Sequence, residues 1–153
     1  MSFPTTVVNS RMEAFKQACV ERGVKVTHQR LEIYRALASS ETHPDAETIY
    51  RCVRKRIPTI SHDTVYRNLK LLSDYGLIAV AGTSNERLRF DANMERHHHF
   101  VCVQCGLIRD FCSEQLESIQ CPREARAFGT PVSLHFEVKG VCTTCGSRTR
   151  NKD

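Results

Sequence analysis

Two short cysteine motifs are the most chemically distinctive feature of this 153-residue sequence. Residues 102–106 read CVQCG and residues 142–146 read CTTCG. Two such pairs can supply the four thiolates of a tetrahedral structural zinc ion, and each glycine allows the tight turn between paired sulfurs. Redox thiols or unliganded core cysteines are the weaker explanation, because two such pairs rarely occur together by accident. The predicted zinc ligands, which would join the ends of a small domain, are Cys102, Cys105, Cys142 and Cys145.

Histidines and carboxylates form a second set of candidate metal ligands. Residues 97–99 are three consecutive histidines, and on a strand His97 and His99 would share one face while His98 takes the other. Mixed imidazole and carboxylate donors suit Fe(II), Mn(II) or Zn(II), and the oxygen donors shift the preference toward manganese and iron. A solvated run of histidines is an equally good explanation for these three residues. Spacing alone does not bring to them the other candidate donors, His43, Asp91 and Asp110.

Four further cysteines have no partner at metal-ligand spacing. Cys19 and Cys52 fall within predicted helices, where we expect them to be small core residues. Cys112 and Cys121 are candidate reactive thiols to which spacing assigns no role.

Composition narrows the class of protein. No stretch of 18 or more apolar residues predicts a membrane span, and the first residues, MSFPTTVVNSR, lack the regions of a secretion signal. We therefore expect a cytoplasmic protein, in which paired cysteines favour metal over disulfides. The net charge of +5 is compatible with a polyanionic partner. Tryptophan is absent and aromatic residues make up 7%, which argues against a stacking platform for single-stranded nucleic acid.

The first half of the chain predicts helices followed by a hairpin. Residues 10–76 show four helical patterns, the first opened by a Ser10–Glu13 capping box and ended at Gly23. Thr27, Asp45 and Ser61 begin the next three, and Pro58 and Gly76 end the last two. Residues 77–81 and 87–91 are short extended runs around a turn-rich loop at 82–86. This order predicts a winged helix-turn-helix.

The second half predicts a small α/β domain, so the fold class is α+β. Residues 99–103, 107–111 and 132–141 resemble strands, and residues 113–128 a helix interrupted at Pro122, with Leu116 and Ile119 inward. The predicted boundaries are a DNA-binding domain at 1–84, a hinge at 85–96 and a dimerisation and metal-binding domain at 97–153.

The fourth helix is the candidate recognition helix for double-stranded DNA. Its early residues would enter the major groove, where Arg67 can bind guanine edges, Tyr66 a thymine methyl or a phosphate, and Lys70 a phosphate. By charge alone an ordinary solvated helix face explains these residues equally well, but the hairpin that follows favours DNA. A domain of this size usually binds a two-fold operator, which predicts a homodimer. The predicted DNA-binding residues are Ser61, His62, Thr64, Tyr66, Arg67 and Lys70.

These motifs, taken in order, resemble a known family. THPDAETIY, ISHDTVYRNLKLLSDYGLI, RFD, HHHFVCVQCG, IRDF and GVCTTC are similar to the signatures of the Fur family, over about residues 10–146. The resemblance implies a winged-helix domain, a C-terminal dimerisation domain and a structural zinc held by the four cysteines already named. It also implies a regulatory Fe(II) or Mn(II) ion that clamps the two domains, with ligands at His43, Asp91, His97, His99 and Asp110.

Within the family, Asp110 favours one group of sensors. Members similar to the peroxide-responsive PerR group have aspartate at this position, where iron-sensing members commonly have glutamate. The resemblance then implies that bound iron reacts with hydrogen peroxide, that a ligand histidine gains oxygen, and that metal loss releases the DNA. By position, the vulnerable residues are His43 and His97.

One departure and three rival functions stand beside this interpretation. Many members carry a histidine where this chain has Leu134, and the following His135 would face the other way on a strand, which counts against a third metal site. The first rival is an iron- or zinc-responsive repressor, since selectivity depends on geometry more than on ligand type. The second is a zinc-dependent hydrolase, disfavoured because no general base is evident, and the third is a thiol redox switch. We therefore expect a regulator and not an enzyme.

Overall fold

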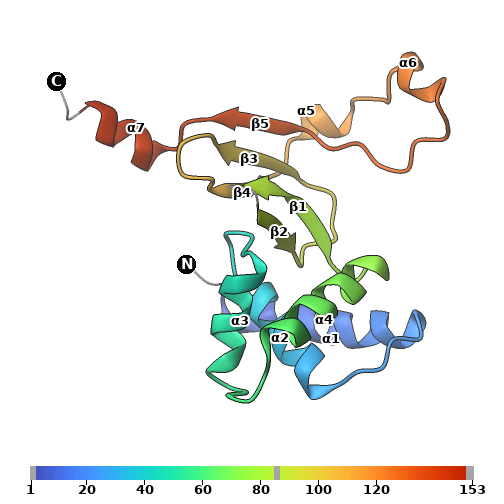
Figure 1. Cartoon of the computed structure of the whole chain (residues 1–153). Helices are drawn as coiled ribbons and strands as arrows, with labels where there is room; N and C mark the ends of the chain where they lie inside the picture. Colours follow the sequence, from blue (N-terminus) through green and yellow to red (C-terminus); the bar gives the residue numbers. More distant parts are fainter. Residues whose placement is uncertain (1–2, 85–86, 151–153) are drawn as a thin grey trace. The chain divides into compact units, whose positions relative to one another are not determined.

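The computed structural model describes residues 3–84 and 87–150, and the chain divides into two units, Met1–Met94 and Glu95–Asp153 (Figure 1). In the described part of the chain, no helix has both the length and the apolar character needed to cross a membrane. The domain boundaries expected from sequence remain predictions. The strand at residues 87–91, placed in the predicted hinge, pairs within the first unit.

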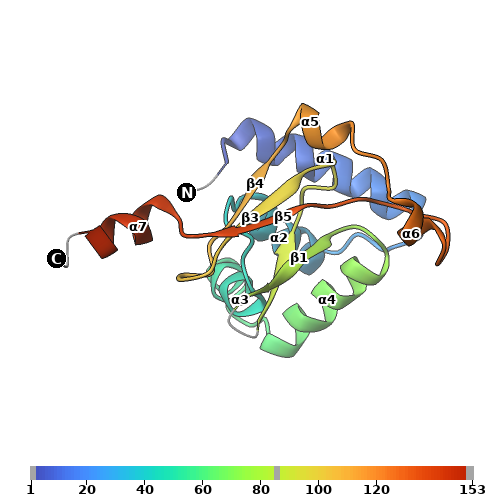
Figure 2. The ribbon, with the colours of Figure 1, turned by 90° about the horizontal axis from the view of Figure 1, so that it is seen from above.

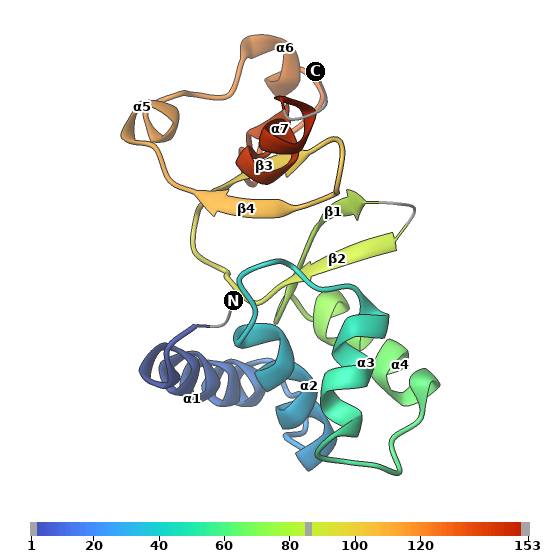
Figure 3. The ribbon, with the colours of Figure 1, turned by 90° about the vertical axis from the view of Figure 1, so that its left-hand side faces the viewer.

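The first unit is built on four helices that enclose one apolar core (Figure 3). Helix α3 packs between α2 and α4, and α1 packs on α2. The core includes fully buried Ile33, Ile49, Val65 and Leu69 from three helices. Cys19 is buried as expected, but the prediction for Cys52 is wrong, because Cys52 lies on the solvent side of α3. The helices are α1 (Thr5–Glu21), α2 (His28–Ala38), α3 (Ala46–Arg54) and α4 (His62–Asp74).

Local capping signals locate three of the four helix starts. The side chains of Thr27, Asp45 and Ser61 accept hydrogen bonds from the backbone N–H three residues later, at 3.3, 2.8 and 3.1 Å. The predicted capping box at Ser10 is wrong, because α1 already begins at Thr5, after Pro4. Proline has a fixed φ and no N–H to satisfy, so it suits the residue before a first helical turn.

A two-stranded antiparallel hairpin completes the first unit. Strands β1 (Ala79–Ser84) and β2 (Arg87–Asp91) pair from Ala79↔Asp91 to Ser84↔Arg87, with an irregularity between Val80 and Gly82. The predicted loop at 82–86 is therefore strand as far as Ser84, and Asn85 and Glu86 lie outside the described residues. The other edge of β2 pairs with the loop before α3, where Phe90 N–H donates to Pro44 O at 3.1 Å and Asp45 bridges Arg89.

The second unit is a three-stranded sheet in the order β4-β3-β5 (Figure 2). Strand β3 (His98–Cys102) is antiparallel to β4 (Ile108–Phe111) and parallel to β5 (Glu137–Gly140). Helix α7 (Thr143–Arg150), which the sequence did not predict, follows β5. The predicted helix at 113–128 is reduced to single turns, α5 (Glu114–Glu117) and α6 (Arg123–Arg126), and Ile119 is 43% exposed.

The predicted strand at 132–141 is also shorter than expected. Residues 131–136 have no regular structure, Val132 is 98% exposed and only residues 137–140 pair with β3. The argument that a strand turns His135 away from a third metal site therefore has no structural basis, although His135 is exposed.

Candidate metal centres and nucleic-acid interface

The four cysteines predicted to bind zinc lie together. Their sulfur atoms are within 4.8 Å of one another, and Cys105 Sγ lies 3.7 Å from Cys142 Sγ. Zinc binds thiolates at about 2.3 Å, so neighbouring corners of a tetrahedron of sulfurs are about 3.8 Å apart. Cys102, Cys142 and Cys145 are buried and Cys105 is exposed. Both the donor set and its spacing fit a structural zinc ion.

The two motifs reach this cluster by different local structures. The first turns at the end of β3, where Gly106 has φ 71° and its N–H donates to Cys102 O at 2.9 Å. That backbone conformation favours glycine. In the second motif Cys142 precedes α7 and Cys145 lies in its first turn, so helical spacing puts both sulfurs on one side. The expectation that Gly146 relaxes a tight turn is wrong, because Gly146 lies within this helix.

Hydrogen bonds within the cluster shift the pKa values of two of its thiols in opposite directions. The Cys142 N–H donates to Cys102 Sγ at 3.3 Å. This bond, with those from Cys105 and Gln104, lowers the pKa of Cys102 to about 6. Hydrogen bonds to Cys142, Cys105 and Cys102, together with burial, raise the pKa of Cys145 to about 12. Without a metal the protons therefore stay on part of the set, and binding of zinc must displace them.

A second donor group lies on the β3–β4 sheet. His99 and Asp110 are cross-strand partners, and His97 directly precedes β3. His97 Nε2 lies 2.9 Å from His99 Nε2, and Asp110 Oδ1 lies 3.6 Å and 3.5 Å from these two atoms. Ligands bound to one ion at about 2.1 Å are roughly 3.0 Å apart at right angles and 3.4 Å apart at a tetrahedral angle. These three residues can therefore share a divalent ion.

The backbone fixes the tautomer of His97. The carbonyl O of Glu95 lies 2.7 Å from His97 Nδ1, and a carbonyl can only accept a hydrogen bond. Nδ1 therefore carries the proton, which leaves the Nε2 lone pair directed at His99 and Asp110. Ligand histidines are commonly oriented in this way.

His98 has a structural role on the opposite face. It is 1% exposed, its ring packs on Phe111 and Phe136, and its Nδ1 accepts from Phe136 N–H at 3.4 Å. Burial, with Arg96 and His135 nearby, lowers the pKa of His98 and keeps it neutral. The alternation expected for residues 97–99 is therefore present.

His43 and Asp91 form a donor pair in the first unit. His43 Nε2 lies 3.3 Å from Asp91 Oδ2, and both residues are about 5% exposed. His43 has φ 49°, which is unusual for a residue with a Cβ and costs of order 1–3 kcal/mol. Such backbone strain persists only where the surroundings impose it, and it is common at functional sites. Here Pro44 O and Asp45 pair with β2 and hold the loop in place.

The predicted DNA-binding residues occupy the outer side of α4. Tyr66 is 52% exposed, Arg67 and Lys70 are exposed, and Val65, Leu69 and Leu72 fill the core beneath them. Ser61 caps the start of the helix by accepting from the Thr64 N–H, and the hydroxyls of Ser61 and Thr64 are in hydrogen-bond contact. Lys70 pairs with Asp74 at 2.9 Å. The N-terminal half of α4 thus presents an aromatic ring and a guanidinium to solvent.

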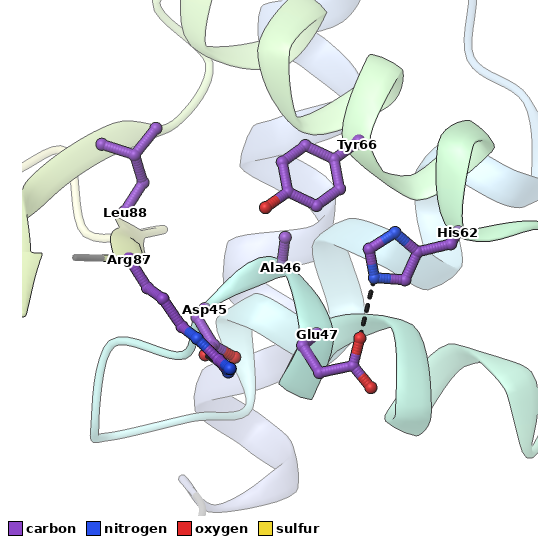
Figure 4. A pocket seen from close by; sticks show the side chains of 7 residues that line it. All are labelled: Asp45, Ala46, Glu47, His62, Tyr66, Arg87 and Leu88. Carbon is purple, nitrogen blue, oxygen red and sulfur yellow. Dashed lines mark hydrogen bonds and ion pairs between the residues drawn. The ribbon is translucent and has the colours of Figure 1, made fainter. Parts of the chain in front are cut away.

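A hollow lies between α4, the start of α3 and the start of β2 (Figure 4). On one side His62 Nε2 contacts Glu47 Oε2 at 2.8 Å, and on the other Arg87 Nη1 donates to Asp45 Oδ2 at 3.0 Å. The hollow measures about 270 Å³, below the roughly 300–1,000 Å³ of small-molecule sites. The sequence interpretation missed Arg87 and Glu47, and took Asp45 only as a helix cap. The β1–β2 hairpin is the wing of the winged helix, and a basic residue in the wing was the sequence signal that could have drawn attention to Arg87.

A family model and a known relative each match most of this chain. The model of the ferric uptake regulator family matches residues 21–139. The peroxide-responsive repressor PerR of Staphylococcus aureus is 34% identical over 145 residues, which covers 95% of this chain and 98% of that protein.

Two solved structures carry the same fold. The ferric uptake regulator Fur of Helicobacter pylori superimposes with a TM-score of 0.70 at 26% identity, covering 95% of this chain and 97% of that one. A zinc-bound manganese uptake regulator superimposes with a TM-score of 0.65 at 37% identity, covering 84% and 98%. With the winged helix, the cysteine cluster and the histidine–carboxylate donors described above, these matches place the chain in the ferric uptake regulator family, whose members are dimeric, metal-responsive DNA-binding regulators.

Proposed function

We propose that this protein is a repressor that responds to hydrogen peroxide through a regulatory iron site. The observation that carries the proposal is a set of histidine and carboxylate donors that contains no thiolate. In this set the donor that follows the first cysteine pair is an aspartate, Asp110. Such donors accept Fe(II) and Mn(II), and they leave zinc to the four cysteines. Similarity to PerR over almost the whole chain supports the same assignment.

The proposed regulatory ligands come from both units. His43 and Asp91 would bind the same ion as His97, His99 and Asp110. Each group is already assembled within its own unit. One ion held by both would restrict the recognition helices of a dimer to the spacing of one operator. Loss of any ligand would release that restriction and, with it, the DNA.

Bound Fe(II) would supply redox chemistry at these ligands, with hydrogen peroxide as the oxidant: one peroxide oxygen would be added to a ligand histidine and the other would leave as water. His97 is held by Glu95 O with Nε2 toward the ion, and His43 is held by the pairing of its loop with β2. Both residues are about 5% exposed, so they would be shielded from bulk solvent while they hold the ion. A histidine that gains oxygen becomes a poorer donor, which explains how the signal would weaken metal binding.

Peptide mass spectrometry tests this proposal directly. Protein loaded with Fe(II) and exposed briefly to hydrogen peroxide is expected to gain one oxygen on the peptide that holds His43 or the one that holds His97. Protein loaded with Mn(II), which does not carry out this reaction, is the control. Unmodified histidines in protein shown to contain iron would refute peroxide sensing and leave the family assignment intact.

A metal-uptake repressor is the second candidate. The specific observation in its favour is that a manganese uptake regulator is 37% identical over 84% of this chain, a similarity comparable to the 34% of PerR over 95%. Iron- or zinc-responsive regulation belongs to the same class of function. In that case, operator binding would follow the concentration of one metal and would not change with peroxide.

Side chains of α4 would contact the bases of the operator. Replacement of exposed Arg67 by alanine is expected to weaken binding to the specific duplex by about 1–3 kcal/mol if the guanidinium contacts a base. The matched control is Arg126→Ala, which removes the same charge from an exposed turn of the second unit. Fluorescence anisotropy with specific and scrambled duplexes measures both. An equal loss on the two duplexes would make Arg67 a phosphate contact.

The second unit would carry the dimer contact. It exposes large apolar side chains, among them Phe128 at 93% and Val132 at 98%. Such surfaces usually mark protein interfaces. A repressor of chromosomal operators works in the cytoplasm, and we place the protein there as part of this proposal.

A further inference from the structure

Arg87 is held in place although most of its side chain is exposed. Its side chain is 63% exposed, while the Asp45 carboxylate with which it pairs is 9% exposed. Exposed arginines usually lose rotamer entropy when they bind, and a fixed partner reduces that cost. A guanidinium has five N–H donors, and the contact from Nη1 to Asp45 Oδ2 leaves others on its exposed side.

Asp45 is itself anchored from two directions. Its Oδ1 accepts from Thr48 N–H at 2.8 Å as the cap of α3, and its Oδ2 accepts from Arg87 at 3.0 Å. The carboxylate therefore cannot turn away from Arg87 without losing the cap of α3.

The segment that carries Asp45 also carries a regulatory ligand. The loop at 43–45 runs antiparallel to β2, with the Phe90 N–H bonded to Pro44 O and Asp45 opposite Arg89. In that register His43 lies opposite Asp91, in agreement with their 3.3 Å contact. The position of Arg87 is thus tied by backbone pairing to the two donors of the first unit.

Arg87 borders the recognition helix. Figure 4 shows its side chain beside Asp45, on the opposite side of the hollow from His62 and Tyr66. Duplex DNA that reached Tyr66 and Arg67 would bring its backbone along this hollow, which is too small for most organic ligands. Arginine suits phosphate because its planar donors match two phosphate oxygens.

We propose that Arg87 is a DNA-phosphate contact of the wing and that Asp45 positions it. This inference rests on the proposed binding of duplex DNA and adds to it a contact outside the recognition helix. It also assigns to Asp45 a role in DNA binding besides the capping of α3.

The first test is the salt dependence of DNA binding. The probes are a duplex that the Mn(II)-loaded wild type selects from a randomised pool and a duplex of scrambled sequence. Arg87→Ala is expected to weaken binding to both and to reduce the slope of log affinity against log salt by about 0.9, the effect of one lost phosphate contact. Arg126→Ala, in the second unit, should leave the slope unchanged. An unchanged slope for Arg87→Ala overturns the inference.

The second test isolates Asp45. Asp45→Asn retains a side chain that caps α3 well but removes the charge that holds Arg87. It is expected to weaken binding in the presence of Arg87 and not in the Arg87→Ala background, where loss of a negative charge can only favour DNA. Thermal unfolding of each variant verifies the fold. Equal weakening in both backgrounds, or tighter binding by Asp45→Asn alone, overturns the positioning role.

Failure of this inference is distinguishable from failure of the proposed function. Wild-type protein that bound neither duplex in any metal state would refute DNA binding, and the inference with it. Wild-type binding together with an unaffected Arg87→Ala variant would refute only the wing contact.

Discussion

Replacement of Cys102 by serine is expected to unfold the second unit, release its zinc and abolish the dimer. Removal of one thiolate leaves three donors, and apparent binding free energies of structural zinc are about 10–16 kcal/mol. The second unit has little else to hold it together. Its buried apolar residues among those described are Ile108 and three of the zinc cysteines, whereas twenty buried residues form the core of the first unit.

Zinc content and sedimentation velocity measure this result. The matched control is Cys52→Ser, which makes the same chemical change at an exposed position of α3. This control should keep its zinc, its dimer and its resistance to proteolysis. A Cys102→Ser protein that remained a stable dimer without zinc would contradict the structural assignment of the cluster.

Replacement of Asp91 by alanine is expected to abolish the dependence of DNA binding on Mn(II) while the structural zinc stays bound. Asp91 is buried beside His43 and lies outside the cysteine cluster, so its loss removes a donor of the proposed regulatory site and leaves the zinc ligands in place. Couplings between a metal effector and a second ligand are typically 1–3 kcal/mol, which is about 5- to 150-fold in affinity. The variant should therefore bind DNA with the weak affinity of the metal-free wild type at every Mn(II) concentration.

Two companion variants separate ligand loss from misfolding. Asp91 Oδ1 also accepts from Asn93 N–H at 2.7 Å, a bond that Asp91→Asn can retain although an amide is a poorer metal ligand. Asp91→Asn should behave like Asp91→Ala in DNA binding and like the wild type in thermal stability. Glu21→Ala, an exposed change at the end of α1, is the control. Operator affinity that still rose with Mn(II) in Asp91→Ala would exclude Asp91 from the regulatory site.

The sequence predicted the first unit better than the second, for a physical reason. Asp45 and Ser61 cap helices through hydrogen bonds to residues three positions later, so the local sequence is enough to predict where these helices start. Residues 132–136 have strand-like composition, but a strand also needs a partner, and of the predicted strand at 132–141 only residues 137–140 pair with β3. Residues 113–128 contain Pro122 and bury little apolar surface, so the helix breaks into single turns.

The chemistry of the candidate sites was readable from residue types alone. Thiolates at Cys-x-x-Cys spacing favour zinc, and histidines with aspartates favour a harder ion, because donor preference belongs to the side chain. The order of the motifs was also sufficient to indicate the family. None of this requires knowledge of which segments lie side by side.

Proximity was decided by the tertiary structure. The register His99↔Asp110 brings one carboxylate to two imidazoles, and α7 supplies Cys145 from a helix that no local pattern predicted. Asp45 and Arg87 are 42 positions apart and meet only because the loop before α3 pairs with β2. Residue type sets what a side chain can bind, but strand pairing and core packing between distant segments set which side chains can bind together.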